Sequence, residues 1–179
     1  MHSKSYRFLT PLIMVLTWAN MEAQTSHPVP RLVVNVTIDQ LRTDYMEAFS
    51  SLFGAGGFNK VMRDGRSYMD AAYPFSHIDR ASAVACIMTG TVPYDNGIVG
   101  EHWMDRKTLR PMYCVDDATC EGWLTSEKYS PVALNVSTVT DELKMATGGR
   151  ALVYSIAPDA DAAILAAGHA ADGAFWIDN

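Results

Sequence analysis

The sequence has few cysteines, no long apolar run and no cluster of basic residues. Its 179 residues include only 3 cysteines, which excludes a small fold stapled by disulfides. No apolar run reaches the roughly 18–20 residues that a membrane-spanning helix needs. Lys and Arg number 14 against 20 Asp and Glu, so the formal charge is −6. Because a negative chain without a basic stripe repels phosphate backbones, we expect no nucleic-acid partner.

The first residues have the pattern of a secretory signal peptide. Basic side chains precede the uncharged stretch 8–19, and polar residues that end at the small Ala23 follow it. We therefore expect residues 1–23 to be a signal peptide and the protein to be exported, to the periplasm or to the extracellular medium. In such an oxidising compartment Cys114 and Cys120 are a candidate disulfide pair.

The apolar residues of the remaining chain predict strands that alternate with helices. The run 32–38 is rich in β-branched residues, which is typical of a parallel strand buried on both faces, and Asp39 follows it. This order indicates an α/β fold with a doubly wound, mostly parallel sheet and helices on both faces. Further strands are expected at 68–73, 150–156 and 174–177, helices at 41–49, 58–62, 81–88, 139–146 and 161–167, and a hairpin at 105–111.

Three stretches carry a resemblance to a known family. They are 33–40 (VVNVTIDQ), 87–98 (IMTGTVPYDNGI) and 163–178 (AILAAGHAADGAFWID). Together they resemble the phosphate-monoesterase branch of the alkaline phosphatase superfamily, which includes the nucleotide pyrophosphatase/phosphodiesterases. The resemblance implies that residues 24–179 are the N-terminal part of an alkaline-phosphatase-like domain, an incomplete core. It also implies phosphoric-ester hydrolysis, with a phosphate ester or another small anionic molecule as substrate.

The resemblance implies zinc chemistry as well. Members of this family hold two zinc ions, and a Thr or Ser at a helix N-terminus attacks phosphorus to form a covalent phospho-enzyme. Zinc lowers the pKa of that nucleophile and clamps the attacking and leaving oxygens. Asp39 occupies the place of a zinc ligand at the end of a strand. The other family ligands lie downstream of this chain, so the cofactor is either zinc or none.

Four positions depart from the family pattern. The nucleophile's place falls on Arg80, and a guanidinium has no lone pair to offer phosphorus. Glu101 stands where the family has a substrate-contacting Asn, and a carboxylate there would repel phosphate. The stretch that carries a phosphate-binding Lys and Arg in the family reads 157–161 here, with Asp159 and Asp161. The residues therefore predict a degenerate phosphomonoesterase site.

Two roles are open for Arg80 and two for Ser82. Arg80 could pair with Asp39 or Asp79 and supply the positive charge that zinc supplies in active relatives, or it could bind an anion at the helix N-terminus. Ser82 is the nearest hydroxyl and could act as a shifted nucleophile, or it could be an ordinary helix serine.

Three hypotheses about function follow. The first is an exported superfamily member with a degenerate site, and the second is an active phosphatase or phosphodiesterase that uses a shifted nucleophile such as Ser82. The third is a non-catalytic envelope binding or assembly protein. The acids Glu101, Asp159 and Asp161 would line the pocket in each case, either as a calcium site or as solvated carboxylates.

Overall fold

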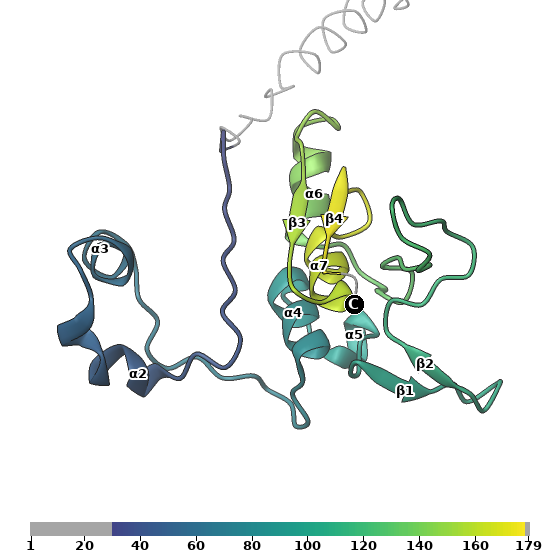
Figure 1. Cartoon of the computed structure of the whole chain (residues 1–179), viewed down its shortest axis with the longest axis horizontal. Helices are drawn as coiled ribbons and strands as arrows, with labels where there is room; N and C mark the ends of the chain where they lie inside the picture. The colour runs from purple at the N-terminus through teal and green to yellow at the C-terminus, as the bar shows by residue number, and fades with distance from the viewer. Residues whose placement is uncertain (1–29, 178–179) are drawn as a thin grey trace, which may run out of the picture. The chain divides into compact units, whose positions relative to one another are not determined.

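The computed structural model describes residues 30–177 (Figure 1). The chain divides into two units, residues 1–33 and 34–179, and every helix and strand described below belongs to the second. The predicted signal peptide lies outside the described residues. Among the helices of residues 30–177, none is long and apolar enough to cross a membrane.

Residues 30–79 contain three short helical segments and no strand. These are α2 (Thr43–Ala48), the 3-10 helix η1 (Ser50–Leu52) and α3 (Gly57–Asp64), and none of them contains a buried residue. The helices expected at 41–49 and 58–62 are therefore confirmed in substance. The strands expected at 32–38 and 68–73 are wrong, because both stretches lack ladder partners among the described residues and are exposed. Without hydrogen-bonded neighbours, a β-branched run has no sheet in which to bury its side chains.

Helix α4 (Arg80–Thr89) is the first element with a buried face. Asp79 occupies its N-cap and forms a capping box with Ser82, and Gly90 ends it with a φ of 69°. Glycine adopts this left-handed conformation at little cost, so Gly90 in the sequence predicts the end of the helix. The helix expected at 81–88 is confirmed.

A short helix and a hairpin follow. Helix α5 (Pro93–Asn96) leads to β1 (His102–Met104), which pairs antiparallel with β2 (Pro111–Tyr113) and confirms the predicted hairpin. Helix α6 (Val139–Ala146) begins at Thr138, whose hydroxyl accepts the Asp141 N–H in a second capping box.

The parallel part of the fold is a β–α–β unit. Strands β3 (Tyr154–Ile156) and β4 (Gly173–Phe175) pair in parallel, and α7 (Ala160–Ala167) connects them. The buried face of α7 packs on α4 to form the core, with side chains from the loops filling the remaining space. The elements expected over 150–156, 161–167 and 174–177 are thus present, with shorter strands. The described fold is α/β, as predicted.

Candidate functional site

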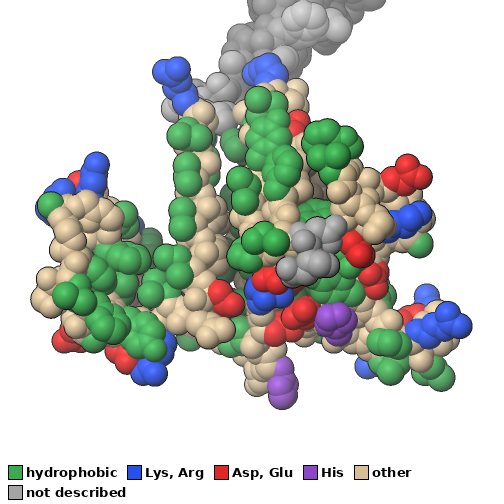
Figure 2. All heavy atoms as spheres, viewed as in Figure 1, with side chains coloured by type: hydrophobic (Ala, Val, Ile, Leu, Met, Phe, Trp, Pro, Cys, Tyr) green, Lys and Arg blue, Asp and Glu red, His purple; other side chains and the backbone are tan. Residues whose placement is uncertain are grey.

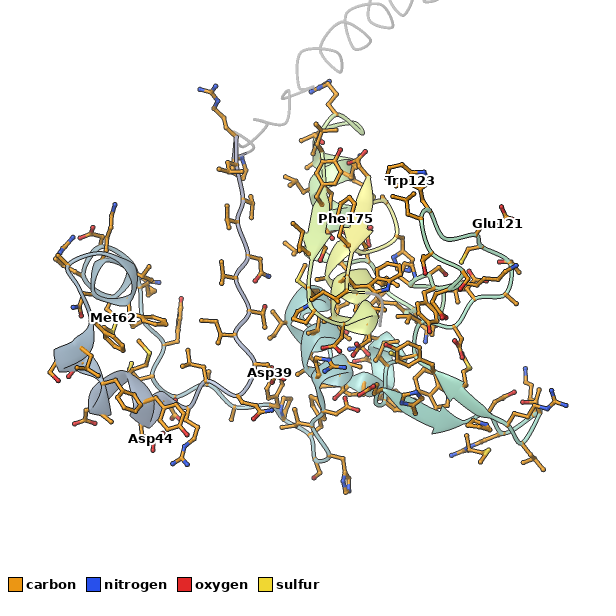
Figure 3. The ribbon with its side chains drawn as sticks, viewed as in Figure 1. Asp39, Asp44, Met62, Glu121, Trp123 and Phe175 are labelled. Carbon is orange, nitrogen blue, oxygen red and sulfur yellow. The ribbon has the colours of Figure 1, made fainter. Side chains whose placement is uncertain are left out.

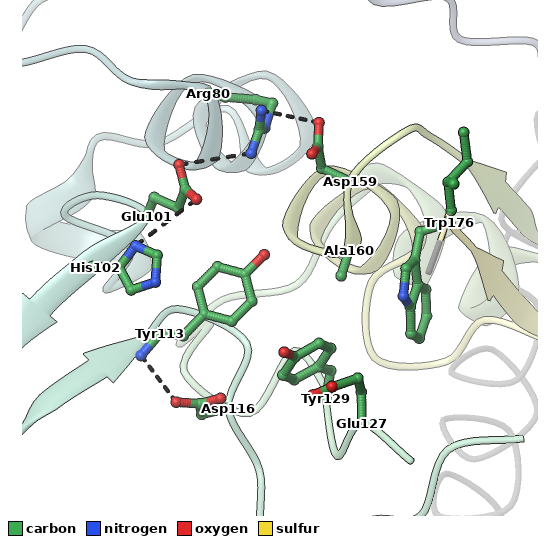
Figure 4. Close-up of a pocket in the computed structure, with 11 residues that line it drawn as sticks. Arg80, Glu101, His102, Tyr113, Asp116, Glu127, Tyr129, Asp159, Ala160 and Trp176 are labelled. Atoms are coloured by element: carbon green, nitrogen blue, oxygen red, sulfur yellow. Dashed lines mark hydrogen bonds and ion pairs between the residues drawn. The ribbon is translucent and has the colours of Figure 1, made fainter. Parts of the chain in front are cut away.

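The N-termini of α4 and α7 meet beside a cavity of about 360 Å³ (Figure 4). Figure 2 shows acidic and basic side chains gathered on the face of the molecule over these two helices. The hairpin, the loop that follows it and the residues after β4 supply the other walls. The lining residues are Arg80, Glu101, His102, Tyr113, Asp116, Glu127, Tyr129, Asp159, Ala160, Trp176 and Ile177.

Arg80, the first residue of α4, is held by three carboxylates. Its Nε and Nη2 each donate to Asp161 over 3.1 Å, Nη1 lies 3.0 Å from Asp159 Oδ2, and Nη2 lies 3.6 Å from Glu101 Oε2. The hydrogen bonds to Asp161 raise the pKa of Arg80 above its ordinary value. The partial positive charge of the helix N-terminus repels a cation at this position, and the three carboxylates offset that repulsion.

Asp161 is the buried member of this network. Its side chain is 0% exposed, whereas that of Asp159 is 47% exposed. The Tyr113 hydroxyl donates to Asp161 Oδ1 and accepts the Asp161 backbone N–H. Burial and the adjacent Asp161 charge raise the pKa of Tyr113, so the phenol keeps its proton. Asp159 stands at the N-cap of α7 but makes no capping hydrogen bond, because its carboxylate contacts Arg80 instead.

Asp79 holds the backbone of Glu101 in place through a hydrogen bond. The Glu101 backbone N–H donates to Asp79 Oδ2 over 2.6 Å. A Cβ at Gly100 would lie 3.0 Å from the same oxygen, so a larger residue there would crowd the Asp79 carboxylate. Burial opposes a low pKa at Asp79, but hydrogen bonds from Ser82 and Glu101 lower it below its ordinary value. The cap of α4 therefore fixes one wall of the cavity.

Ser82 does not face the cavity. It is fully buried, and its hydroxyl lies 2.8 Å from Asp79 Oδ1 and 3.1 Å from the Asp79 backbone nitrogen. The Asp79 N–H bond is one half of the capping box of α4, and the Ser82 N–H bond to Asp79 Oδ1 is the other half. The serine sits in the first turn of its helix as an N3 residue, which is a structural role.

The expected partners of Arg80 are wrong. No ion pair joins Arg80 to Asp39 or Asp79 in the part of the chain that the structure describes. Asp79 is turned toward the cap instead, and Asp39 is an exposed residue at the end of the extended segment (Figure 3). The carboxylates that hold Arg80 come from α7 and from the start of the hairpin, far along the chain.

The described residues do not assemble a zinc site. Across residues 30–177, no three His, Cys, Asp or Glu side chains are placed to share a metal ion. All three cysteines are free, so the candidate pair Cys114 and Cys120 is not a disulfide. The Cys120 thiol instead donates to the carbonyls of Asp117 and Tyr129.

Sequence reasoning missed the aromatic side of the cavity. His102 and Tyr113 of the hairpin, Tyr129 of the loop after it and Trp176 after β4 line it. Their ring centroids are 4.8, 5.3 and 6.2 Å apart in that order, so neighbouring rings contact one another. The predicted hairpin brings His102 to Tyr113, but no sequence spacing signals the whole set, because only the tertiary fold adds Tyr129 and Trp176.

Two alkaline phosphatases are similar in sequence to this chain. Alkaline phosphatase PhoV of Synechococcus elongatus is 40% identical over 153 residues, which are 84% of this chain and 28% of that protein. Alkaline phosphatase PafA of Elizabethkingia meningoseptica is 32% identical over 177 residues, which are 97% of this chain and 32% of that protein. The chain thus spans about a third of the length of these relatives.

Two crystal structures of PafA are similar to this chain in fold. The crystal structure of wild-type PafA matches with a TM-score of 0.79 and 35% identity, over 85% of this chain and 30% of that one. A PafA variant in which one threonine, one asparagine, one lysine and one arginine are replaced matches with a TM-score of 0.73 and 33% identity, over the same shares of the two chains.

The family description also covers most of the sequence. Residues 33–177 match the type I phosphodiesterase / nucleotide pyrophosphatase family. This range contains the α4 cap, the hairpin and the β3–α7–β4 unit, and therefore the whole cavity. The chain belongs to the type I phosphodiesterase / nucleotide pyrophosphatase family of the alkaline phosphatase superfamily.

Proposed function

We propose that this protein is an exported member of the superfamily that does not hydrolyse phosphomonoesters at the family's nucleophile position. The proposal rests on Arg80, which falls at that position by the resemblance, and the observation that carries it is that three carboxylates bind its guanidinium. A guanidinium keeps its proton in proteins and offers no lone pair to phosphorus. Its hydrogen bonds to Asp161 hold it in place rather than leave it free for a phosphoryl group.

The residues replaced in the PafA variant support the same reading. The replaced threonine and asparagine lie 21 positions apart, and the replaced lysine and arginine lie 2 apart. Arg80 and Glu101 have the first spacing here, and Asp159 and Asp161 have the second. Two neutral and two cationic residues thus correspond to one cation and three anions. A pocket of this charge repels a phosphoryl group.

The shifted-nucleophile alternative has little support. Ser82 is buried and its hydroxyl is engaged with Asp79, so an incoming phosphate ester could not reach it without breaking the α4 cap. We also propose no step through zinc, because no three His, Cys, Asp or Glu side chains of residues 30–177 are placed to share a metal ion. The pocket therefore fits a non-catalytic binding protein better than a phosphatase or phosphodiesterase.

Hydrolysis of p-nitrophenyl phosphate and of bis-p-nitrophenyl phosphate tests this proposal. We expect the full-length protein, with and without added zinc, to give no turnover above buffer. Hydrolysis that disappears in Arg80→Ala or Ser82→Ala, while the circular dichroism spectrum is retained, would overturn the proposal. Asp44→Ala is a suitable control, since Asp44 is exposed and pairs only with Arg42 among the described residues.

Export is proposed from the predicted signal peptide over residues 1–23. Its removal would leave Gln24 as the first residue of the mature protein. Cell fractionation combined with mass spectrometry of the N-terminal peptide tests this. A cytoplasmic protein that retains residues 1–23 would contradict it.

A further inference from the structure

His169 joins two segments that meet at the end of α7. The residue follows Gly168, the C-cap of that helix, and its ring contacts α6 and the loop of residues 130–137. Nδ1 lies 3.0 Å from Asp141 Oδ2, and Nε2 lies 3.0 Å from the Leu134 carbonyl oxygen. Each ring nitrogen therefore has an oxygen at hydrogen-bonding distance.

Both of these oxygens can only accept a hydrogen bond. The Leu134 oxygen is a backbone carbonyl. Burial alone would raise the pKa of Asp141, but its hydrogen bonds outweigh burial and lower this pKa to about 2, so the carboxylate is ionised near neutral pH. A neutral imidazole has one N–H group and one bare nitrogen, whereas an imidazolium has two N–H groups. The doubly protonated ring of His169 can thus donate to both oxygens, and the neutral ring to only one of them.

The neutral ring is expected to keep its bond to Asp141 and lose the bond to Leu134. A hydrogen bond to an ionised carboxylate is stronger than one to a neutral carbonyl, so the last proton stays on Nδ1. Nε2 then turns a lone pair toward the Leu134 carbonyl. Leu134 is 3% exposed, and its carbonyl accepts no other hydrogen bond in the part of the chain that the structure describes. A buried acceptor without a donor destabilises the arrangement that contains it.

The other hydrogen bonds between α6 and the end of α7 do not depend on that proton. The Ala170 N–H donates to Asp141 Oδ1 over 2.8 Å, and the Thr140 hydroxyl donates to the Ala167 carbonyl over 2.7 Å. Helix α6 therefore stays docked when His169 is neutral, and the contact that changes is the one with the loop.

Asp141 is the ionisable group that faces His169 from α6. The loop 130–137 contains no ionisable side chain. The other ionisable side chains of α6, of α7 and of the residues after His169 have partners elsewhere: Glu142 with Ser137, Lys144 with Asp172, and Asp159 and Asp161 with Arg80. The His169 side chain is 40% exposed, so its proton can exchange with bulk water.

We propose that His169 is a proton-dependent latch that holds the loop 130–137 against the end of α7. At low pH the imidazolium bridges Asp141 and Leu134, and at high pH the neutral ring releases the Leu134 carbonyl. The loop begins next to Tyr129, which lines the cavity, so the latch acts on the segment behind one cavity wall. This inference goes beyond the proposed function and does not depend on it.

NMR of the histidine ring nitrogens tests the latch directly. The full-length protein is labelled with nitrogen-15 histidine, and the His169 signals are assigned by their absence in His169→Gln. At about pH 5.5 we expect a proton on both ring nitrogens, and at about pH 9 a proton on Nδ1 alone. A neutral ring protonated on Nε2, or a ring that keeps both protons at the higher pH, would overturn the proposal. If His169→Gln does not fold, Gln variants of the other histidines assign the signal by elimination.

Urea denaturation at two pH values measures what the latch contributes. Glutamine carries no charge and donates from a single nitrogen, so His169→Gln should lower the urea midpoint. We expect this decrease to be about twice as large at about pH 5.5 as at about pH 8.5, since the neutral ring already lacks one of the two bonds. His77→Gln is the matched control, because His77 is an exposed histidine of the segment before α4, and its effect should be the same at both pH values. A decrease for His169→Gln that is equal at the two pH values, or larger at the higher one, would refute the latch.

Discussion

Loss of the Asp161 charge should destabilise the protein far more than loss of the Asp159 charge. Both carboxylates pair with Arg80 at about 3 Å, but Asp161 is 0% exposed and Asp159 is 47% exposed. Removing one partner of a fully buried pair costs about 3–5 kcal/mol. Because the Arg80 side chain is 29% exposed and retains Asp159 and Glu101, we expect Asp161→Asn to lower the free energy of unfolding by about 1–3 kcal/mol.

Asp159→Asn is the matched control. It removes the same charge from the same guanidinium, and asparagine is equally suited to the N-cap position that Asp159 holds. An exposed ion pair contributes about 0–1 kcal/mol, so we expect a loss below 1 kcal/mol. The two variants differ in the burial of the carboxylate and in the hydrogen bonds that Asp161 alone accepts, two from Arg80 and one from Tyr113.

Urea denaturation measures the difference. The midpoint should fall clearly for Asp161→Asn and little for Asp159→Asn, with the slope unchanged for both. Adding Arg80→Met to each background gives a double-mutant cycle, in which the coupling of Arg80 to Asp161 should exceed 1 kcal/mol, on the order of measured values for buried pairs. Equal losses for the two single variants would refute the reasoning that the buried carboxylate anchors the guanidinium.

Two further predictions concern acid stability and thiol reactivity. Burial alone would raise the pKa of Asp141, but hydrogen bonds from Thr138, His169 and Ala170 outweigh it and lower this pKa to about 2. This folded-state pKa lies below the unfolded value, so the stabilisation is complete above about pH 4 and is lost as the pH falls toward 2. In urea midpoints, Asp141→Asn should therefore be less stable than the parent protein at pH 5 and approach it near pH 2; a constant difference would contradict this. Burial raises the pKa of the Cys114 thiol to about 12, and the residue is 0% exposed, so iodoacetamide at pH 8 should leave it unmodified in the folded protein. After unfolding without a reductant all three cysteines should react by peptide mass spectrometry, and recovery of a linked Cys114–Cys120 peptide would contradict the structure.

The charged members of the candidate site could be predicted from the sequence, but its aromatic members and the contacts between its residues could not. The departures at Arg80, Glu101, Asp159 and Asp161 are visible in the sequence, because each falls at a motif position. The sequence favours Asp39 and Asp79 as partners of Arg80, because these acids are near it in sequence or in the family motif, but the structure pairs Arg80 with acids of α7 and of the hairpin start. Distance in space between α4 and α7 depends on helix packing, and no local pattern reports it.

The sequence by itself determined the local elements whose signals are local. The Asp79 and Thr138 caps, the left-handed Gly90 and the hairpin follow from side-chain hydrogen bonds and backbone sterics within a few residues. Only the tertiary structure decided that the run 32–38 has no strand partner among the described residues. It also decided that rings of the hairpin, of the loop after it and of the segment after β4 line one cavity with the carboxylates. The reason is physical: a cap needs only its neighbours along the chain, whereas a ladder or a cavity needs surfaces that other parts of the chain must bring to it.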